Sequence, residues 1–155
     1  MGRCRVVRPQ EVQLSLSDGD WIRVKKRLTA GESREQFSRI VKDAPGGERP
    51  TLSSMQVGLS RILAYLLDWS LVDDKGVVLP LRNARGEIAI DVMTASLNSI
   101  DPESFGEILS AVEAHEDAMD KEREAEKNVT GGGNELPATS PSLVGLAGGT
   151  SGSPS

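Results

Sequence analysis

Cysteine and histidine are nearly absent from the chain of 155 residues, which has one of each, Cys4 and His115. A lone cysteine cannot form an internal disulfide, so the composition is typical of a protein of a reducing cytosol. The common zinc sites draw four ligands from cysteine and histidine, which these two residues cannot supply. Met119 stands where a His-Glu-x-x-His zinc helix starting at His115 and Glu116 would need its second histidine. We therefore expect no metal site.

Long apolar runs are also missing, since none reaches the roughly 18 residues that span a bilayer. The first ten residues, MGRCRVVRPQ, have no apolar segment of the kind that signal peptides contain. Val6 stands where a myristoylation signal needs serine or threonine. We expect a flexible N-terminus over residues 1–10, no membrane association and a cytoplasmic location.

No set of residues with the spacing of a catalytic or cofactor site is present. Cys4 lies in the N-terminal segment, a poor place for a preorganised nucleophile. Gly131-Gly132-Gly133 is not followed by the Gly-Lys-Ser/Thr of a phosphate-binding loop. The carboxylates between Glu113 and Glu126 fall on a solvated helix, where burial cannot tune their pKa. We expect a protein that is not an enzyme, with no catalytic residue and no cofactor, and the sequence leaves the partner-binding residues unassigned.

The net charge of −5 is divided unevenly. Residues 1–49 carry eleven Lys/Arg against seven Asp/Glu, whereas residues 101–128 carry three against ten. The two ends could meet different partners or each other, which leaves self-association open. The cluster Lys25-Lys26-Arg27 could grip phosphate or an acidic partner, or it could be a solvated strand end that blunts a sheet edge, and we favour the second. The acidic balance predicts no nucleic-acid binding.

The most apolar stretch is Thr51–Val72, which we expect to be one central helix. Its apolar residues recur at spacings of three and four, as on one face of a helix: Met55, Leu59, Ile62, Leu66 and Trp69, widened by Leu63 and Leu67. Arg61 and Asp68 would form the opposite, hydrated face. Each large side chain buried in this way stabilises the fold by roughly 1.5–3 kcal/mol.

The residues before this helix predict a β-hairpin and a short helix. Val12, Leu14 and Leu16 alternate with polar residues, and Ser17-Asp18-Gly19-Asp20 is a turn leading into Trp21–Lys25, so Glu11–Leu28 should be the hairpin. Thr29 and Glu32 match a capping box for a helix with Phe37, Ile40 and Val41 on one face. Asp43-Ala44-Pro45-Gly46-Gly47 should end that helix as a flexible joint.

The residues after the predicted central helix predict turns, a second hairpin and two further helices. Asp73–Gly76 and Asn83–Gly86 are turns, Val77–Leu81 is an extended run that Pro80 confines to an edge, and Glu87–Ile90 could pair back. Asp91 could cap a helix with Met93, Leu97 and Ile100. Asp101-Pro102-Glu103 begins a second helix, whose buried face would be Phe105, Ile108, Leu109, Val112 and Met119.

The last 27 residues, Val129–Ser155, include eighteen Gly, Ser, Thr or Pro and should be a disordered tail. Its one apolar patch, Leu143–Leu146, is either a short docking motif or, as we favour, without a role. The fold class is therefore mainly α (α+β): a small helical domain over residues 11–128, with an N-terminal β-hairpin and a disordered C-terminal tail.

The order of several segments resembles the tail assembly chaperones of long-tailed (siphovirus-type) bacteriophages, particularly those of actinobacterial hosts. The resemblance covers roughly Glu11 to Asn128. The segments that carry it are Ser17–Ile22, Lys25–Leu28, Ala64–Leu71 with the Asp73–Gly76 turn and short Val/Pro strand that follow, Asp101–Ile108, His115-Glu116 and the acidic helix ending Glu126-Lys127-Asn128.

The resemblance implies a non-enzymatic role in virion morphogenesis, performed in the cytoplasm of the bacterial host. Such a chaperone binds the long helical tape measure protein, helps recruit the tail tube (major tail) protein and is absent from the mature virion. It also implies a ribosomal frameshift that yields a longer second product, for which codons of Glu126–Asn128 or Gly131–Gly133 could supply the slippery run. The alternatives are a structural tail or connector protein of the virion, and a small nucleic-acid-binding regulator using Lys25–Arg27.

Overall fold

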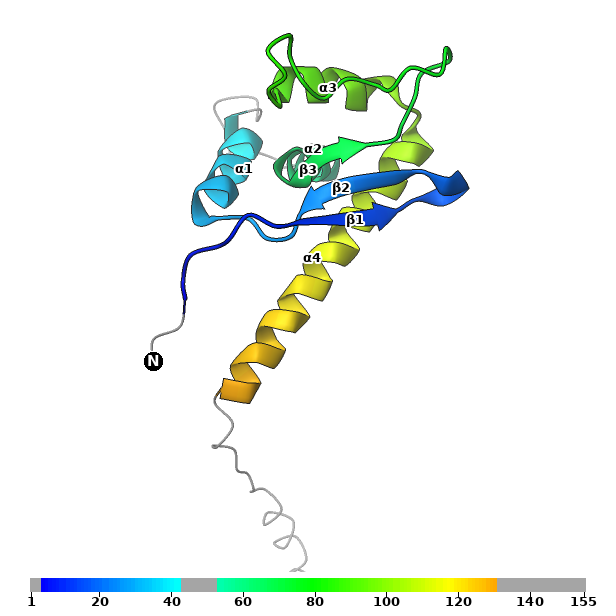
Figure 1. Ribbon diagram of the computed structural model, residues 1–155. Coiled ribbons are helices and arrows are strands. Elements are labelled where there is room, and N and C mark those ends of the chain that lie inside the picture. The colour runs from blue at the N-terminus through cyan, green and yellow to red at the C-terminus, as the bar shows by residue number, and fades with distance from the viewer. Residues whose placement is uncertain (1–3, 43–52, 131–155) are drawn as a thin grey trace, which may run out of the picture. The chain divides into compact units, whose positions relative to one another are not determined.

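The computed structural model describes residues 4–42 and 53–130, and it has the mainly helical architecture with an N-terminal hairpin that the sequence predicts (Figure 1). The chain divides into two compact units, Met1–Met119 and Asp120–Ser155. The described elements are β1 (Glu11–Ser15), a 3-10 turn (Ser17–Gly19), β2 (Trp21–Lys25), α1 (Ala30–Lys42), α2 (Ser54–Tyr65), β3 (Leu66–Trp69), α3 (Ile90–Ser99) and α4 (Pro102–Thr130).

The predicted hairpin is confirmed, and it forms two strands of an antiparallel sheet in the order β1-β2-β3. Its turn needs left-handed backbone, which Asp18 (φ 57°) and Gly19 (φ 83°) supply. The side chains of β1 alternate between exposed and half-buried, and Ile22 and Val24 of β2 are fully buried. The hairpin therefore contributes one face to the core.

The predicted central helix is wrong in its second half, because α2 ends at Tyr65 and Leu66–Trp69 form strand β3. This strand pairs with β2 through a register shift between Arg23 and Val24. Such an irregularity lets two residues at odd spacing point to the same side of a sheet. Leu66 and Trp69 are both 2% exposed for this reason, and their spacing of three imitates a helical pattern.

Other details of that prediction also change. Met55 is 68% exposed, because α2 has only just begun there, capped by Ser53, whose Oγ accepts a bond from the Met55 N–H. Arg61 is not on a hydrated face: its guanidinium lies 2.8 Å from Glu113 and 3.3 Å from Glu116 of α4. Asp68 stays half-exposed and lies 3.7 Å from Arg23.

The first residue of the predicted helix, Thr51, lies outside the described residues.

Helix α1 begins with the predicted capping box. The Thr29 N–H donates to Glu32 Oε2 (2.9 Å), and the Glu32 N–H donates to Thr29 Oγ1 (3.2 Å). The expected apolar face is only partly correct, since Ile40 is buried but Phe37 and Val41 are exposed. The predicted joint at residues 43–47 lies outside the described part of the chain.

The start of α4 is as predicted and that of α3 is not. Asp101 accepts bonds from the N–H and the hydroxyl of Ser104 (2.9 and 2.7 Å), as a helix cap does. Asp91 lies inside the first turn of α3, because the cap position is Ala89, which has no side-chain oxygen. The helix starts there because the Ala89 N–H bonds the Leu81 carbonyl and so closes the preceding loop, while the Ala89 carbonyl accepts the Met93 N–H.

The core gathers residues from the sheet and from α2, α3 and α4. Ile108 and Val112 of α4 are fully buried, while Phe105, Leu109 and Met119 are half-buried. In the second unit, residues 120–129 of α4 have exposed side chains apart from the half-buried Glu122. Val129 and Thr130, predicted as the start of the tail, are the last two residues of α4. The rest of the predicted tail, residues 131–155 with Leu143–Leu146, lies outside the described residues.

Candidate functional site

Two successive loops between β3 and α3 repeat the same backbone design at an offset of ten residues. The first loop (residues 71–79) is closed by the bridge Val72↔Val78, and the second loop (residues 81–89) by the bridge Arg82↔Ile88. The predicted turns are therefore confirmed, while the second hairpin is reduced to a single bridge.

The same pattern of side-chain hydrogen bonds holds both loops, from an aspartate in the first and an asparagine in the second. Asp73 Oδ1 accepts the N–H groups two and four residues later at 2.8 and 2.9 Å, and Asn83 Oδ1 does the same at 2.9 and 3.1 Å. Each loop then turns at a glycine with positive φ, Gly76 (79°) and Gly86 (80°). Both turns therefore have the same two features: a side-chain oxygen that accepts backbone N–H bonds, and a glycine three residues later.

Aliphatic side chains on these loops and at the start of α3 remain exposed to solvent. We call them the apolar loop surface: Val72 (52%), Val77 (60%), Val78 (52%), Ile88 (38%) and Ile90 (37%). Among the described residues ten large hydrophobic side chains are exposed, so half of them fall within these nineteen positions. Single exposed aliphatics are ordinary, and this concentration along one short segment makes the two loops a candidate interaction site.

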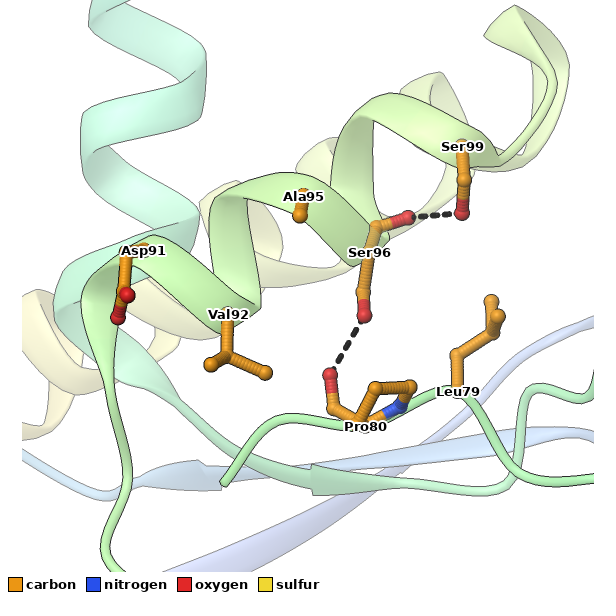
Figure 2. A pocket seen from close by; sticks show the side chains of 7 residues that line it. All are labelled: Leu79, Pro80, Asp91, Val92, Ala95, Ser96 and Ser99. Atoms are coloured by element: carbon orange, nitrogen blue, oxygen red, sulfur yellow. Dashed lines mark hydrogen bonds between the residues drawn. The ribbon is translucent and has the colours of Figure 1, made fainter. Parts of the chain in front are cut away.

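An open groove of about 460 Å³ lies between α3 and the segment that joins the two loops (Figure 2). Its lining is mainly apolar and small: Leu79, Pro80, Asp91, Val92, Ala95, Ser96 and Ser99. The side chain of Val92 points from α3 toward the joining segment. Because Ala95 and Ser99 are short, the α3 surface offers room for larger side chains from outside.

The polar groups of the groove are mostly satisfied within it. Ser96 Oγ donates to the Pro80 carbonyl, and Ser99 Oγ donates to the Ser96 carbonyl at 2.7 Å, as Figure 2 shows. On the far side, Trp69 Nε1 donates to the Leu79 carbonyl at 2.9 Å, which fixes the joining segment to the core. The groove thus combines a mainly apolar lining with one charged group, the exposed Asp91 carboxylate, at one end.

The lone cysteine and lone histidine lie apart from this groove. Cys4 is exposed. His115 is 5% exposed in the core, where Nε2 lies 3.1 and 3.0 Å from the carbonyl oxygens of Lys25 and Lys26. Within residues 4–42 and 53–130, no three Cys, His, Asp or Glu side chains form a group that could hold a metal ion. In the same ranges, no helix combines the length and apolarity that crossing a membrane requires.

The basic cluster is more enclosed than a solvated strand end would be. Lys25, Lys26 and Arg27 are all half-buried, and Lys25 Nζ lies 2.8 Å from Glu32 Oε1. Both Lys25 and Arg27 line a recess of about 170 Å³ that Glu11 and Glu32 also line. Cations already beside carboxylates are poor phosphate ligands.

Neither the groove nor the apolar loop surface is evident from the amino-acid sequence alone. The sequence feature that could have indicated them is a repeat at an offset of ten residues, Asp73–Gly76 and Asn83–Gly86, with aliphatic residues after each glycine. Aliphatic residues in this position predict the strands of a hairpin, whereas the loops expose them to solvent. Comparison with protein-family models, curated proteins and solved structures finds no match to the chain.

Proposed function

We propose that the protein is a phage tail assembly chaperone that binds the tape measure protein and helps recruit tail tube subunits during tail morphogenesis. The observation that supports this most is the apolar loop surface beside the α3 groove. A chaperone for a long, aggregation-prone helical protein needs an exposed apolar surface on a charged, well-folded carrier. The segment order described above supplies the identity of the partner.

The groove suits an amphipathic helix of the tape measure protein. Such helices present side chains at spacings of three and four, which can enter a groove lined by short residues. Ala95 and Ser99 of α3 leave that space, and the loops on either side of the joining segment expose further aliphatic side chains, Val77, Val78 and Ile88. Asp91 at the end of the groove favours a basic residue flanking the helix's apolar stripe.

The other functions have less support. A structural tail or connector protein of the virion would also use an apolar surface, but it would remain in the particle, whereas the proposed chaperone leaves in the host cytoplasm before maturation. A nucleic-acid-binding regulator would use Lys25–Arg27, and Lys25 is already paired with Glu32. No specific observation favours either function.

The test is co-purification with the tape measure protein encoded nearby. We expect a soluble complex when the two proteins are co-expressed, and precipitation of the tape measure protein when it is expressed alone. Val78→Asp places a carboxylate on the apolar loop surface and should abolish the complex. Val6→Asp is the matched control, because Val6 is also an exposed valine (77%) but lies outside that surface.

The two valine variants decide whether the apolar loop surface carries the binding. Loss of the complex with Val78→Asp and its retention with Val6→Asp would support the proposal. An unchanged complex with both variants would refute the surface, and the absence of any complex with the unaltered chain would refute the function. Recovery of the protein from purified virions would favour the structural alternative.

A further inference from the structure

The outer edge of strand β1 is open. Leu16 N–H donates to the Asp20 carbonyl and Lys26 N–H to the Gln10 carbonyl, both at 2.8 Å. Because hydrogen-bonded pairs alternate along an antiparallel ladder, these two bonds direct the backbone groups of the even-numbered β1 residues toward β2. The N–H and C=O groups of Glu11, Gln13 and Ser15 therefore point away from the sheet, and within the described ranges none of them has a hydrogen-bond partner.

The core face of β1 is also incompletely covered. Val12, Leu14 and Leu16 pack against the core cluster, yet they are only half-buried. Their neighbours on β2, Ile22 and Val24, are 0% exposed. The apolar layer thus stops at an edge that exposes both unpaired backbone groups and part of its own side chains.

We propose that a second copy of this chain pairs with β1 in antiparallel orientation, which joins two three-stranded sheets into one. The two-fold axis would lie at Gln13, so that Gln13 pairs with the partner's Gln13, and Glu11 with the partner's Ser15. Every outward N–H and C=O group of these residues then acquires a partner, with two bonds in each hydrogen-bonded pair.

The residue pattern fits this register on both faces. On the polar face, each Glu11 meets the partner's Ser15, so no two like charges stand opposite each other. On the core face, Val12 lies opposite the partner's Leu14, which extends the apolar rows that begin at Ile22 and Val24 of β2. Shifting the centre to Glu11 would place two carboxylates opposite each other, and moving the axis to a point between Gln13 and Leu14 would set outward backbone groups opposite inward ones.

The self-pairing is expected to be weak. A five-residue strand buries less surface than the roughly 1,200 Å² of a standard stable interface. The fraction of chains in dimers should therefore rise over a wide range of protein concentration. This inference does not depend on the identity of the proposed partner, because it concerns a different edge of the molecule from the α3 groove.

The first test is sedimentation equilibrium of the full chain over a wide concentration range. The average mass should rise from the 16.6 kDa of one chain toward twice that value. Gln13→Pro should hold the chain at one copy, because proline lacks the outward N–H that the partner needs and that the β1–β2 ladder does not use. Gln13→Thr keeps this N–H, so it should associate like the unaltered chain.

A pair of opposite charges at one position tests the register. Ser15→Lys places a cation opposite the partner's Glu11 and should tighten association severalfold, whereas Ser15→Glu places a carboxylate there and should weaken it severalfold. Both shifts should shrink at high salt. Circular dichroism confirms that each variant keeps its fold.

A chain that remains single at every concentration would overturn the proposal. So would association that Gln13→Pro leaves intact, because another surface would then join the copies. Equal effects of the two Ser15 variants would refute the register.

Discussion

His115 Nε2 on α4 lies 3.1 Å from the carbonyl oxygen of Lys25 at the end of β2, and 3.0 Å from that of Lys26. Both oxygens are acceptors, so this nitrogen carries the hydrogen and donates to them. The ring also meets Tyr65 of α2 edge-on, with centroids 6.0 Å apart. One buried imidazole therefore joins α4 to the sheet and to α2, which gives the lone histidine a structural role.

Replacing this histidine should destabilise the fold markedly. His115→Ala removes the donor from two carbonyl groups and leaves a cavity beside Tyr65, and we expect the free energy of unfolding to fall by about 2–4 kcal/mol. Urea denaturation followed by circular dichroism measures the loss. Ser110→Ala is the control, because Ser110 is exposed on the same helix. Equal midpoints for the two variants would contradict the role of His115.

The boundary between α2 and β3 gives a second prediction, because it separates two neighbouring leucines. Leu66 is 2% exposed and Leu67 is half-buried, whereas one continuous helix would bury both. Leu66→Ala should cost about 2–5 kcal/mol of unfolding free energy, and Leu67→Ala clearly less. Thermal or urea unfolding compares them. Similar losses would favour the continuous helix.

Local rules predicted the elements whose signals are local. The turn at Ser17–Asp20, the capping box of Thr29 and Glu32, and the cap at Asp101 depend on residues close in sequence, and all three are confirmed. The strand at Leu66–Trp69 was missed because a bulged strand and a helix can both bury residues three apart. Only the pairing with β2, more than forty residues earlier, separates the two structures.

The candidate site was missed for a related reason. The sequence predicts the turns at Asp73–Gly76 and Asn83–Gly86, but it does not indicate that the aliphatic residues beside them face solvent. That depends on which side chains the core already accommodates, namely Leu81 and Trp69 at 6% and 2% exposure. The groove itself exists because Ser96 of α3 bonds the Pro80 carbonyl, a contact between segments sixteen residues apart.

Replacing glycine by alanine should lower stability in the second loop and raise it in helix α4. Gly86 has φ 80°, which alanine adopts only with strain, so Gly86→Ala should destabilise the second loop by about 1 kcal/mol or more. Gly106→Ala is the opposite case: Gly106 lies in α4, and a Cβ there would meet nothing within 4 Å. That variant should gain about 0.5–1 kcal/mol. Melting temperatures that move in the same direction would contradict this assignment.

The Glu32 carboxylate should make stability depend on pH. Burial raises its pKa, but hydrogen bonds from Lys25 and Thr29, together with the charge of Lys25, outweigh burial and hold the pKa below 4.5. A carboxyl whose pKa is lower in the folded state contributes stability that is fully present above its unfolded value. That contribution is lost as the pH falls from about 4.5 through the lowered folded-state pKa.

Glu32→Gln should remove this contribution, because glutamine still accepts the Thr29 N–H bond but carries no charge. The difference in unfolding free energy between the unaltered chain and the variant should be greatest at neutral pH and shrink as the pH falls below 4.5. Glu35→Gln is the control, since the Glu35 side chain is 73% exposed and lies 3.7 Å from Arg39. Urea titrations at several pH values measure both variants. Other carboxyls, such as Asp101, whose pKa is also lowered by hydrogen bonds from Ser104, titrate in all three proteins and cancel in the difference. A difference that stays constant with pH would show that Lys25 does not stabilise the charged form of Glu32.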